Sequence, residues 1–469
     1  MRRALRVLYC IVRCMSVDES IFTQPGRHIH FVGIGGVSMA QLAELLHTRG
    51  LKVTGSDAAE SPRVAALRSL GLAVSPLHDG SLLANAMAVV RSAAIRDDNP
   101  EVLLAQARGI PVLARAELLG AIMRGYRRTV CVSGTHGKTT TTSMLAQIAQ
   151  HAELDPTIFI GAKTPALPKG FRVGRSDVMV VESCEYHNSF LRFHPNISVI
   201  LNIEADHLDF FKGLEDLQSA FRKFAELTPD DGALMVNADD ANVLKTVKNL
   251  PCTAFGLSES ADVRAQNIVW ERSLPRFDVT VKGRQYAHLT LPVPGRHNLY
   301  NALAAVGIAA LLGVPGPDAA AALADFRAAE RRMEYKGQCN GADIIDDYAH
   351  HPTAAALTLE AVRGMGYRRV LLVYQPHTYS RTAALFQEFA AALSAADLVI
   401  LPDIYAARET DDLGVSSGRL AAQIPNGRYI ADFEEIADLL RAQARRGDAI
   451  LTMGAGDVYK VGELLTRPS

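Results

Sequence analysis

Short apolar strands alternate with amphipathic helical patterns in three successive stretches of the chain, and no other feature limits its fold as strongly. The first stretch begins at His28–Val32, the second at Thr129–Val132, and the third contains Val370–Tyr374. Strands joined through helices pair in parallel within one sheet, because the chain must cross back over the sheet before the next strand begins. The sequence therefore predicts an α/β protein with parallel sheets.

The length agrees with three domains, since 469 residues suffice for three at roughly 150 residues each. The predicted parts are residues 1–27, a first domain over 28–126, a central domain over 127–327 and a C-terminal domain over 328–469. Residues 252–293 alternate at period two, which predicts a small antiparallel annex on the central domain. The charged stretch Ala328–Lys336 is predicted to be a hinge.

The first 27 residues match no domain pattern. Arg6 and Arg13 bound a short apolar stretch, and no small-residue cleavage site follows it, so a signal peptide is not predicted. We predict a disordered extension over residues 1–27 and leave open whether Met1 or Met15 is the start.

The composition excludes several classes of protein. Lys and Arg number 49 against 50 Asp and Glu, so a broad basic surface for nucleic acid is not expected. No apolar run approaches the roughly 18 residues of a membrane span, so no membrane insertion is expected. The six cysteines form no CxxC pair. We therefore predict reduced, buried cysteines in a cytoplasmic protein, and not a disulfide framework or a zinc site.

A first glycine cluster, Gly33-Ile-Gly-Gly36, follows the strand His28–Val32. Its backbone amides and the next helix N-terminus are suited to a phosphate, and Asp57 closes the following strand, where an acid can hold a ribose. Ser38 stands at the third glycine position of the dinucleotide fingerprint. Both a nucleotide-type ligand and a tight structural turn are compatible with this pattern.

A second glycine cluster is more specific: Ser133-Gly-Thr-His-Gly-Lys-Thr-Thr140 lies between a predicted strand and a predicted helix. Glycines at 134 and 137 allow a curled backbone whose amides point at phosphate oxygens, Lys138 supplies a cation, and Thr139 can ligate Mg²⁺. This is a shortened phosphate loop. The predicted fold is therefore an N-terminal Rossmann-like domain, a central P-loop-type ATPase domain with an antiparallel annex, and a C-terminal Rossmann-like domain.

Acidic residues follow two further strands of the central stretch. Val178–Val181 leads into Glu182-Ser-Cys-Glu185, and Val199–Ile203 leads into Glu204-Ala-Asp-His207. The carboxyl ends of parallel strands share one edge of a sheet, so Glu185 and His207 are expected beside the phosphate loop. With Thr139 they are predicted to complete a Mg²⁺ site.

The motifs, taken in order over about residues 28–469, resemble the Mur ligases of peptidoglycan synthesis. The matching segments include the two glycine clusters, Gly55-Ser-Asp57, Glu182–Glu185, Asn202–His207, Gly295–Ala302, Asp346–Pro352, Gln375–Thr382 and Gly454–Asp457. The resemblance implies an ATP-dependent ligase that joins L-alanine to the carboxylate of UDP-N-acetylmuramate through an acyl phosphate. A sister ligase that adds another amino acid or a recycled peptide to the same nucleotide sugar is the alternative.

The resemblance also implies roles for individual residues. ATP would be bound by Gly134, Thr135, His136, Gly137, Lys138, Thr139, Thr140, His297, Asn301, Arg332 and Asp347. Thr139 and Glu185 would hold one Mg²⁺, and Glu185 with His207 a second. UDP-N-acetylmuramate would be bound by Gly35, Gly36, Ser56, Asp57, Ser92 and Asn202. His350 and Arg381 would face the amino acid and a carboxylate, with His350 as the expected base. The catalytic set is thus Lys138, Glu185, His207 and His350.

Some positions depart from the family pattern. Thr378 stands where many relatives carry Arg, Met333 where Phe is usual, and Tyr186-His187 where Ser-Asp is common. Phe221 falls where other members carry a carbamylated lysine, so that modification is not predicted.

A nicotinamide-dependent oxidoreductase would leave the Lys138 loop unexplained, and a nucleotide switch would leave Glu185 and His207 unexplained. The acceptor amino acid and the oligomeric state are not readable from the residues.

Overall fold

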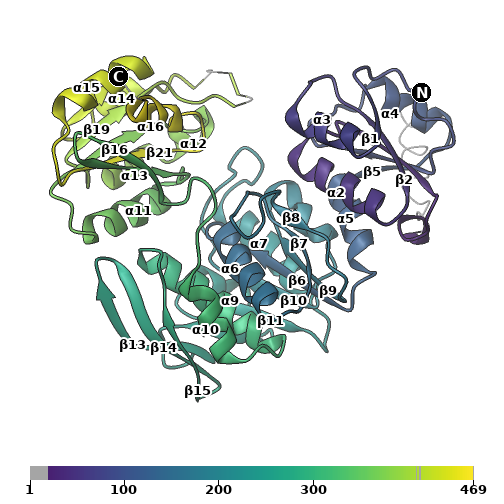
Figure 1. The fold of residues 1–469 in the computed structure, drawn as a ribbon, viewed down its shortest axis with the longest axis horizontal. Helices are drawn as coiled ribbons and strands as arrows, with labels where there is room; N and C mark the ends of the chain where they lie inside the picture. The colour runs from purple at the N-terminus through teal and green to yellow at the C-terminus, as the bar shows by residue number, and fades with distance from the viewer. Residues whose placement is uncertain (1–18, 408, 411–412, 468–469) are drawn as a thin grey trace. The chain divides into compact units, whose positions relative to one another are not determined.

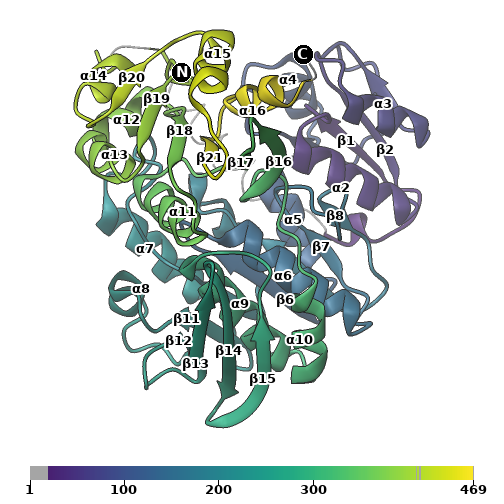
Figure 2. The same ribbon diagram turned by 60° about the vertical axis from the view of Figure 1, so that its left-hand side comes forward.

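The computed structural model describes residues 19–407, 409–410 and 413–467. The chain divides into two compact units: the first holds the residues up to Thr129 with 177–179 and 189–195, and the second holds the rest. Figures 1 and 2 show the elements in two views. The predicted α/β class with three sheets is confirmed, whereas the three domain boundaries stay predictions.

A five-stranded parallel sheet of order β3-β2-β1-β4-β5 organises the first unit. Its strands are β1 (His28–Val32), β2 (Lys52–Ser56), β3 (Ala73–Ser75), β4 (Ala88–Arg91) and β5 (Val112–Ala114). The helices are α2 (Val37–Thr48), α3 (Pro62–Ser69), α4 (Pro100–Ala107) and α5 (Arg115–Met123). Ser61 and Asn99 cap α3 and α4 with their side chains, and a proline follows each cap, so these two helix starts are set locally.

A ten-stranded sheet of order β15-β14-β13-β12-β11-β10-β6-β9-β7-β8 carries the predicted phosphate loop. Its strands are β6 (Arg128–Ser133), β7 (Thr157–Phe159), β8 (Phe171–Arg172), β9 (Val178–Glu182), β10 (Ile197–Ile200), β11 (Ala233–Asn237), β12 (Thr253–Gly256), β13 (Val263–Glu271), β14 (Leu274–Val281) and β15 (Arg284–Thr290). Strand β6 lies between β10 and β9, so the phosphate loop and both acidic segments leave neighbouring strands.

Helices and the antiparallel annex complete this part of the second unit. The helices are α6 (Lys138–His151), α7 (Leu214–Ala225), α8 (Ala241–Thr246), α9 (Arg296–Leu311) and α10 (Gly316–Ala324), with a 3-10 segment η2 (Tyr186–Arg192). The antiparallel strands β13, β14 and β15 form the predicted annex, and Figure 2 shows α9 and α10 beside them. Helix α6 packs on α9, which places the start of α6 close to the side chains of α9.

A six-stranded sheet of order β16-β17-β21-β18-β19-β20 follows in the same unit. Its strands are β16 (Glu334–Cys339), β17 (Ala342–Asp347), β18 (Val370–Tyr374), β19 (Leu398–Leu401), β20 (Gly427–Tyr429) and β21 (Ala449–Met453). All neighbours are parallel except β16 and β17. The helices are α11 (Pro352–Gly364), α12 (Tyr379–Ala384), α13 (Phe386–Leu393), α14 (Ser417–Ala421), α15 (Phe433–Gln443) and α16 (Tyr459–Thr466).

Three predictions need correction. Of the predicted disordered extension, residues 1–18 lie outside the described residues, and Glu19–Phe22 form a 3-10 helix (η1) whose Phe22 side chain is buried. The predicted hinge ends earlier than expected, because residues 334–336 belong to β16, where Glu334 and Tyr335 pair with β17. Cys131 and Cys339 are buried as predicted, but Cys184 is half-buried and Cys252 is exposed; Cys10 and Cys14 lie outside the described residues.

No helix in the described part of the chain is long and apolar enough to span a membrane.

Candidate active site

The phosphate loop joins β6 to α6 through two glycines with positive φ. Gly134 has φ 142° and Gly137 has φ 83°, conformations that side chains rarely adopt. A Cβ atom at Gly137 would lie 2.4 Å from Asn301 Oδ1, so close packing also requires glycine there. The curled loop leaves the first amides of α6 without intrahelical partners, which is the arrangement that binds phosphate.

Lys138 lies at the start of α6 and pairs with Glu185. Its Nζ donates to the two carboxylate oxygens at 2.9 and 3.1 Å, and also to the carbonyl oxygens of Gly134 and Thr135. Burial alone would lower the pKa of Lys138, but the Glu185 charge outweighs it and raises that pKa. Burial alone would raise the pKa of Glu185, but Lys138 and His207 hold it below its usual range. Both groups are therefore charged at neutral pH.

The predicted Mg²⁺ residues divide into two pairs. His207 Nε2 lies 3.6 Å from Glu185 Oε1, which brings these two together as predicted. Thr139 Oγ1 instead donates to Glu182 Oε1 at 2.9 Å, so Glu182 joins the set. Sequence reasoning noticed Glu182 at the strand end but gave it no role. One hydroxyl, two carboxylates and one imidazole are a donor set that fits Mg²⁺, which prefers oxygen ligands.

Tyr186, a departure from the family pattern, orients His207. The two rings stack with centroids 4.6 Å apart, and the Tyr186 hydroxyl donates to Asp209 Oδ2 at 2.5 Å. His207 itself has a positive φ of 53°. Sequence reasoning missed this contact because a ring stack between separate loops has no spacing signal.

His297 and Asn301 both lie on α9. His297 is half-buried, its buried Nδ1 has no hydrogen-bond partner among the described residues, and desolvation together with the Arg332 charge lowers its pKa to about 4. A neutral imidazole with an unused nitrogen is suited to a ligand contact. Asn301 accepts from Thr141 Oγ1 at 3.2 Å and donates to Asn298, so it braces α6 against α9.

Asn202 also braces the phosphate loop. Its Oδ1 accepts from the His136 amide at 2.7 Å, and its Nδ2 donates to the His136 carbonyl at 3.1 Å. The Thr135 amide donates to the Asn202 carbonyl oxygen. Both ends of its side-chain amide are therefore engaged by the loop, although Asn202 was predicted among the nucleotide-sugar residues. Thr140 is buried on the first turn of α6.

Arg381, at α12, is paired with Asp206. Its Nε and Nη2 both donate to Asp206 Oδ1, at 3.0 and 2.9 Å. Burial would raise the pKa of Asp206, but the Arg381 charge holds it well below its usual range.

His350 Nδ1 lies 2.9 Å from the Tyr348 carbonyl oxygen. Because a carbonyl oxygen only accepts, Nδ1 carries the hydrogen and Nε2 is left to accept a proton. Burial first, and then the Arg381 charge, lower the pKa of His350.

Asp347 and Arg332 are held within their own segment. Asp347 accepts from the Met333 amide at 2.9 Å and from the Ala349 amide at 2.8 Å, and burial raises its pKa. The Arg332 guanidinium lies 5.2 Å from the centre of the Tyr348 ring. Met333 contacts Asp347 through its backbone amide and not through its side chain. This hydrogen bond is therefore available with Met at the position where Phe is usual.

The predicted nucleotide-sugar residues of the first unit gather around β1 and β2. The Gly35 amide donates to Asp57 Oδ2 at 2.8 Å, and a Cβ at Gly35 would lie 2.8 Å from that oxygen. Gly36 precedes α2 as its N-cap. Ser92 follows β4, and its amide donates to the Val32 carbonyl oxygen.

Ser56 takes part in a buried network that sequence reasoning missed. Its hydroxyl donates to Glu101, and the same carboxylate lies 3.2 Å from His78 Nδ1, 3.3 Å from His30 Nε2 and 3.3 Å from the Gly80 amide. Burial alone would raise the pKa of Glu101, but the hydrogen bonds from His30 and Ser56 lower it. Glu101 therefore stays ionised and fixes Ser56 at the end of β2.

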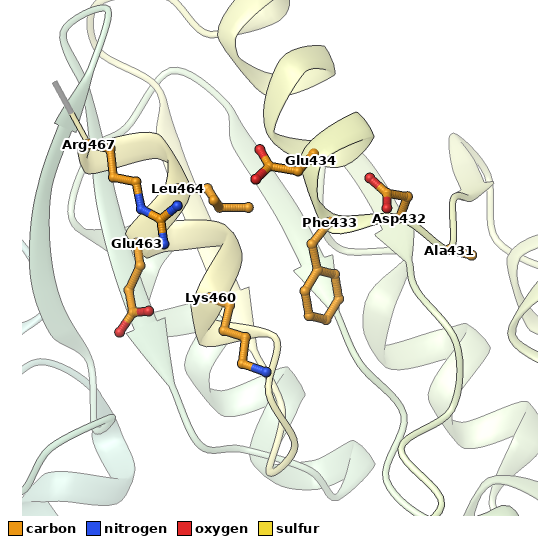
Figure 3. Close-up of a pocket in the computed structure, with 8 residues that line it drawn as sticks. All are labelled: Ala431, Asp432, Phe433, Glu434, Lys460, Glu463, Leu464 and Arg467. Carbon is orange, nitrogen blue, oxygen red and sulfur yellow. The ribbon is translucent and has the colours of Figure 1, made fainter. Parts of the chain in front are cut away.

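A pocket of about 530 Å³ lies between α15 and α16, and none of the residues that line it is a predicted site residue (Figure 3). Its lining carries both signs of charge, from Asp432, Glu434, Glu463, Lys460 and Arg467. Lys460 is already paired with Asp457 at 3.0 Å. The mixed charge marks no particular ligand.

Known proteins match the chain along its length. The model described as "Mur ligase family, catalytic domain" matches residues 28–127, "Mur ligase middle domain" matches 132–309, and "Mur ligase, glutamate ligase domain" matches 331–456. A UDP-N-acetylmuramate–L-alanine ligase of Clostridium novyi is 46% identical, over 93% of this chain and 97% of that protein.

Two solved structures are similar over most of the chain. The UDP-N-acetylmuramate–alanine ligase of Thermotoga maritima matches with a TM-score of 0.75 and 28% identity, over 93% of this chain and 98% of that one. A murein peptide ligase of Psychrobacter arcticus matches with a TM-score of 0.66 and 26% identity, over 94% of this chain and 98% of that one.

Proposed function

This chain belongs to the Mur ligase family, and from that premise we propose that it joins L-alanine to the carboxylate of UDP-N-acetylmuramate at the expense of ATP. The observation that carries the choice of acceptor is the 46% identity, over nearly the full length, to a ligase of that specificity. The phosphate loop, with Lys138 next to Glu185, supports an ATP-driven reaction rather than nucleotide binding alone.

ATP is assigned to the phosphate loop, with His297 as the adenine contact. Thr139, Glu185 and His207 would hold Mg²⁺, with Glu182 beside them. When bound, Mg²⁺ offsets negative charge on the phosphate oxygens. Lys138 does the same from the protein side, because its ammonium lies at the helix N-terminus where the γ-phosphoryl group is expected.

The reaction has two halves. In the first, a carboxylate oxygen of the nucleotide sugar forms a bond to the γ-phosphorus, and the bond from that phosphorus to the β–γ bridging oxygen breaks, which gives an acyl phosphate and ADP. In the second, the amine of L-alanine attacks the acyl carbon and phosphate leaves. The amine must first lose a proton, and we assign its acceptance to His350 Nε2, since Nδ1 already donates to the Tyr348 carbonyl.

UDP-N-acetylmuramate is assigned to the Gly35, Gly36, Ser56, Asp57 and Ser92 region of the first unit. The amides of the β1–α2 turn suit a diphosphate. Asn202 is assigned an indirect role, because its amide holds the phosphate loop.

The test is substrate dependence of ATP hydrolysis. We expect multiple-turnover ADP release only when both UDP-N-acetylmuramate and L-alanine are present, and at most one ADP per active site without L-alanine. A screen of amino acids and murein peptides should give L-alanine the highest kcat/KM. A preference for a peptide, the activity named for the Psychrobacter relative, would contradict the proposal. ADP release without any nucleotide sugar would contradict a ligase altogether.

Glu185→Gln tests the metal assignment. The change keeps the size of the side chain but removes the charge opposite Lys138 and His207. We expect activation to need about 10- to 100-fold more Mg²⁺, measured as initial rate against Mg²⁺ concentration. Glu226→Gln removes an exposed carboxylate paired with Arg222 and should leave the Mg²⁺ curve in place. Coinciding curves for Glu185→Gln and the unaltered protein would remove Glu185 from the metal site.

Glu101→Gln tests the buried network of the first unit. In the variant, the NH₂ group of the glutamine amide faces the N–H and O–H groups that donate to the Glu101 carboxylate. We therefore expect the free energy of unfolding of this unit to fall by about 2 kcal/mol. Hydrogen exchange of the β1 amides measures it. Because folding lowers the pKa of Glu101, its contribution is present above the ordinary glutamate pKa and is lost as the pH falls below it. The variant should therefore lose less stability on acidification than the unaltered protein.

The matched control is Asp97→Asn in the same unit, an exposed carboxylate beside Arg91. It should change stability by less than about 0.5 kcal/mol. Equal effects of the two substitutions would contradict the role given to Glu101.

A further inference from the structure

We propose that His136, Glu204 and His351 bind a divalent cation of the Zn²⁺ type, at a position separate from the Mg²⁺ residues. Among the described residues, this is the one group of three or more His, Cys, Asp or Glu whose ligand atoms all lie within 4.8 Å of one another. His136 comes from the phosphate loop, Glu204 from the segment after β10, and His351 from the N-cap of α11. The proposal is independent of the ligase reaction.

Two of the three spacings between the ligand atoms are close to those around a tetrahedral ion, and the third lies within 4.8 Å. Bonds of about 2.0–2.1 Å to nitrogen and oxygen place tetrahedral ligand atoms about 3.4 Å apart. Glu204 Oε2 accepts from His136 Nε2 at 3.2 Å and lies 3.5 Å from His351 Nδ1, so an ion bound here would take the place of the hydrogen on His136 Nε2. The two imidazole rings tilt toward each other with centroids 4.8 Å apart. Two histidines and one carboxylate are a frequent protein ligand set for Zn²⁺ and leave its fourth position open.

The hydrogen bonds of His351 point the correct nitrogen at the group. Its Nε2 lies 3.1 Å from the Ala205 carbonyl oxygen, which only accepts, so Nε2 carries the hydrogen. Nδ1 is then the unprotonated nitrogen; it accepts from the Thr353 amide at a long 3.4 Å and lies 3.5 Å from Glu204 Oε2. A cation bound at Nδ1 would replace that long hydrogen bond. A ring that donates to a backbone carbonyl through its other nitrogen is the usual arrangement of a metal-binding histidine.

Hydrogen bonds from their backbone amides also fix the positions of His136 and Glu204. The His136 amide donates to Asn202 Oδ1 at 2.7 Å, and the Glu204 amide donates to Thr135 Oγ1 at 3.0 Å. The side chains of His136 and Glu204 remain partly exposed, so an ion can enter. Two nitrogen donors favour Zn²⁺ or Co²⁺ over Mg²⁺. A bound ion would fasten α11 to the phosphate loop.

The experiment measures metal binding by the full chain without nucleotide or substrates. Zn²⁺ is titrated in competition with a chromophoric chelator, in excess Mg²⁺, and Co²⁺ absorption reports the geometry. We expect one tight Zn²⁺ per chain, a tetrahedral Co²⁺ spectrum, and affinity about 100-fold or more weaker in His351→Gln and in Glu204→Gln. Circular dichroism establishes whether each variant is folded. If one variant does not fold, the Zn²⁺ affinity of the other variant alone tests the proposal.

Two controls separate this group from other sites. His288→Gln removes one member of an exposed His–Asp pair on the annex and should leave Zn²⁺ affinity unchanged. Glu185→Gln should also leave it unchanged, because Glu185 belongs to the Mg²⁺ residues. No tight Zn²⁺ in the unaltered protein, unchanged affinity in a folded His351→Gln, or loss of the ion in Glu185→Gln would each overturn the proposal. None of these outcomes depends on ligase activity, so the proposed function is judged separately.

Discussion

Lys138→Ala should lower turnover about 100- to 1,000-fold, because it removes a charge that acts mainly on the phosphoryl group in transfer. In the structure, Lys138 Nζ lies 2.9 Å from a buried Glu185 oxygen, at the first residue of α6. Binding of UDP-N-acetylmuramate should persist, since its proposed residues belong to the first unit. Steady-state kcat and calorimetric binding of the nucleotide sugar measure the two effects separately.

The control is Lys223→Ala. Lys223 is an exposed lysine of α7, two residues after the fully buried Phe221, where the lysine modification is not predicted. We expect an unchanged rate for this variant, which would also agree with the predicted absence of the modification. Turnover of Lys138→Ala equal to that of the unaltered protein would contradict the ATP assignment.

The phosphate loop could be predicted because everything it needs is local. The glycines, Lys138 and the start of α6 lie within a few residues, and the backbone conformation follows from the residue types. The approach of Glu185 to His207 could be predicted by one further step, namely that parallel strands end at one edge of a sheet. That step predicts which residues lie near one another, but not which of them form hydrogen bonds. Thr139 was therefore assigned to Glu185, whereas the Thr139 hydroxyl donates to Glu182.

The contacts that could not be predicted join residues distant in sequence. Ser56 and Glu101 are 45 positions apart, and Asp206 and Arg381 are 175 apart. The packing of strands and helices determines which side chains surround a buried acid. The spacing of residues along the chain does not indicate these contacts. Asp347 lies under the same limit: its carboxylate already accepts from Met333, Ala349 and Thr358, which spacing along the chain did not indicate, and its predicted ATP contact stays a prediction.

Arg381→Lys should raise the KM for L-alanine about 10- to 100-fold, since a planar fork that holds a carboxylate with two donors is replaced by a single ammonium. In the structure two nitrogens of Arg381 donate to Asp206 Oδ1, and His377 Nδ1 lies 3.1 Å from a third. Asp206 thus already occupies two donors of the guanidinium, and the L-alanine carboxylate would have to share or replace that contact. Arg363→Lys, an exposed pair with Asp397, is the matched control and should behave like the unaltered protein.

The two halves of the reaction separate this role from a structural one. Lys138 and the Mg²⁺ residues are unaltered in Arg381→Lys, so formation of the acyl phosphate, trapped by borohydride reduction without L-alanine, should continue. Its consumption on addition of L-alanine should slow. A purely structural ion pair with Asp206 predicts instead that both halves fall together and that Asp206→Asn does the same. Unchanged alanine dependence in Arg381→Lys would place the alanine carboxylate elsewhere in the second unit.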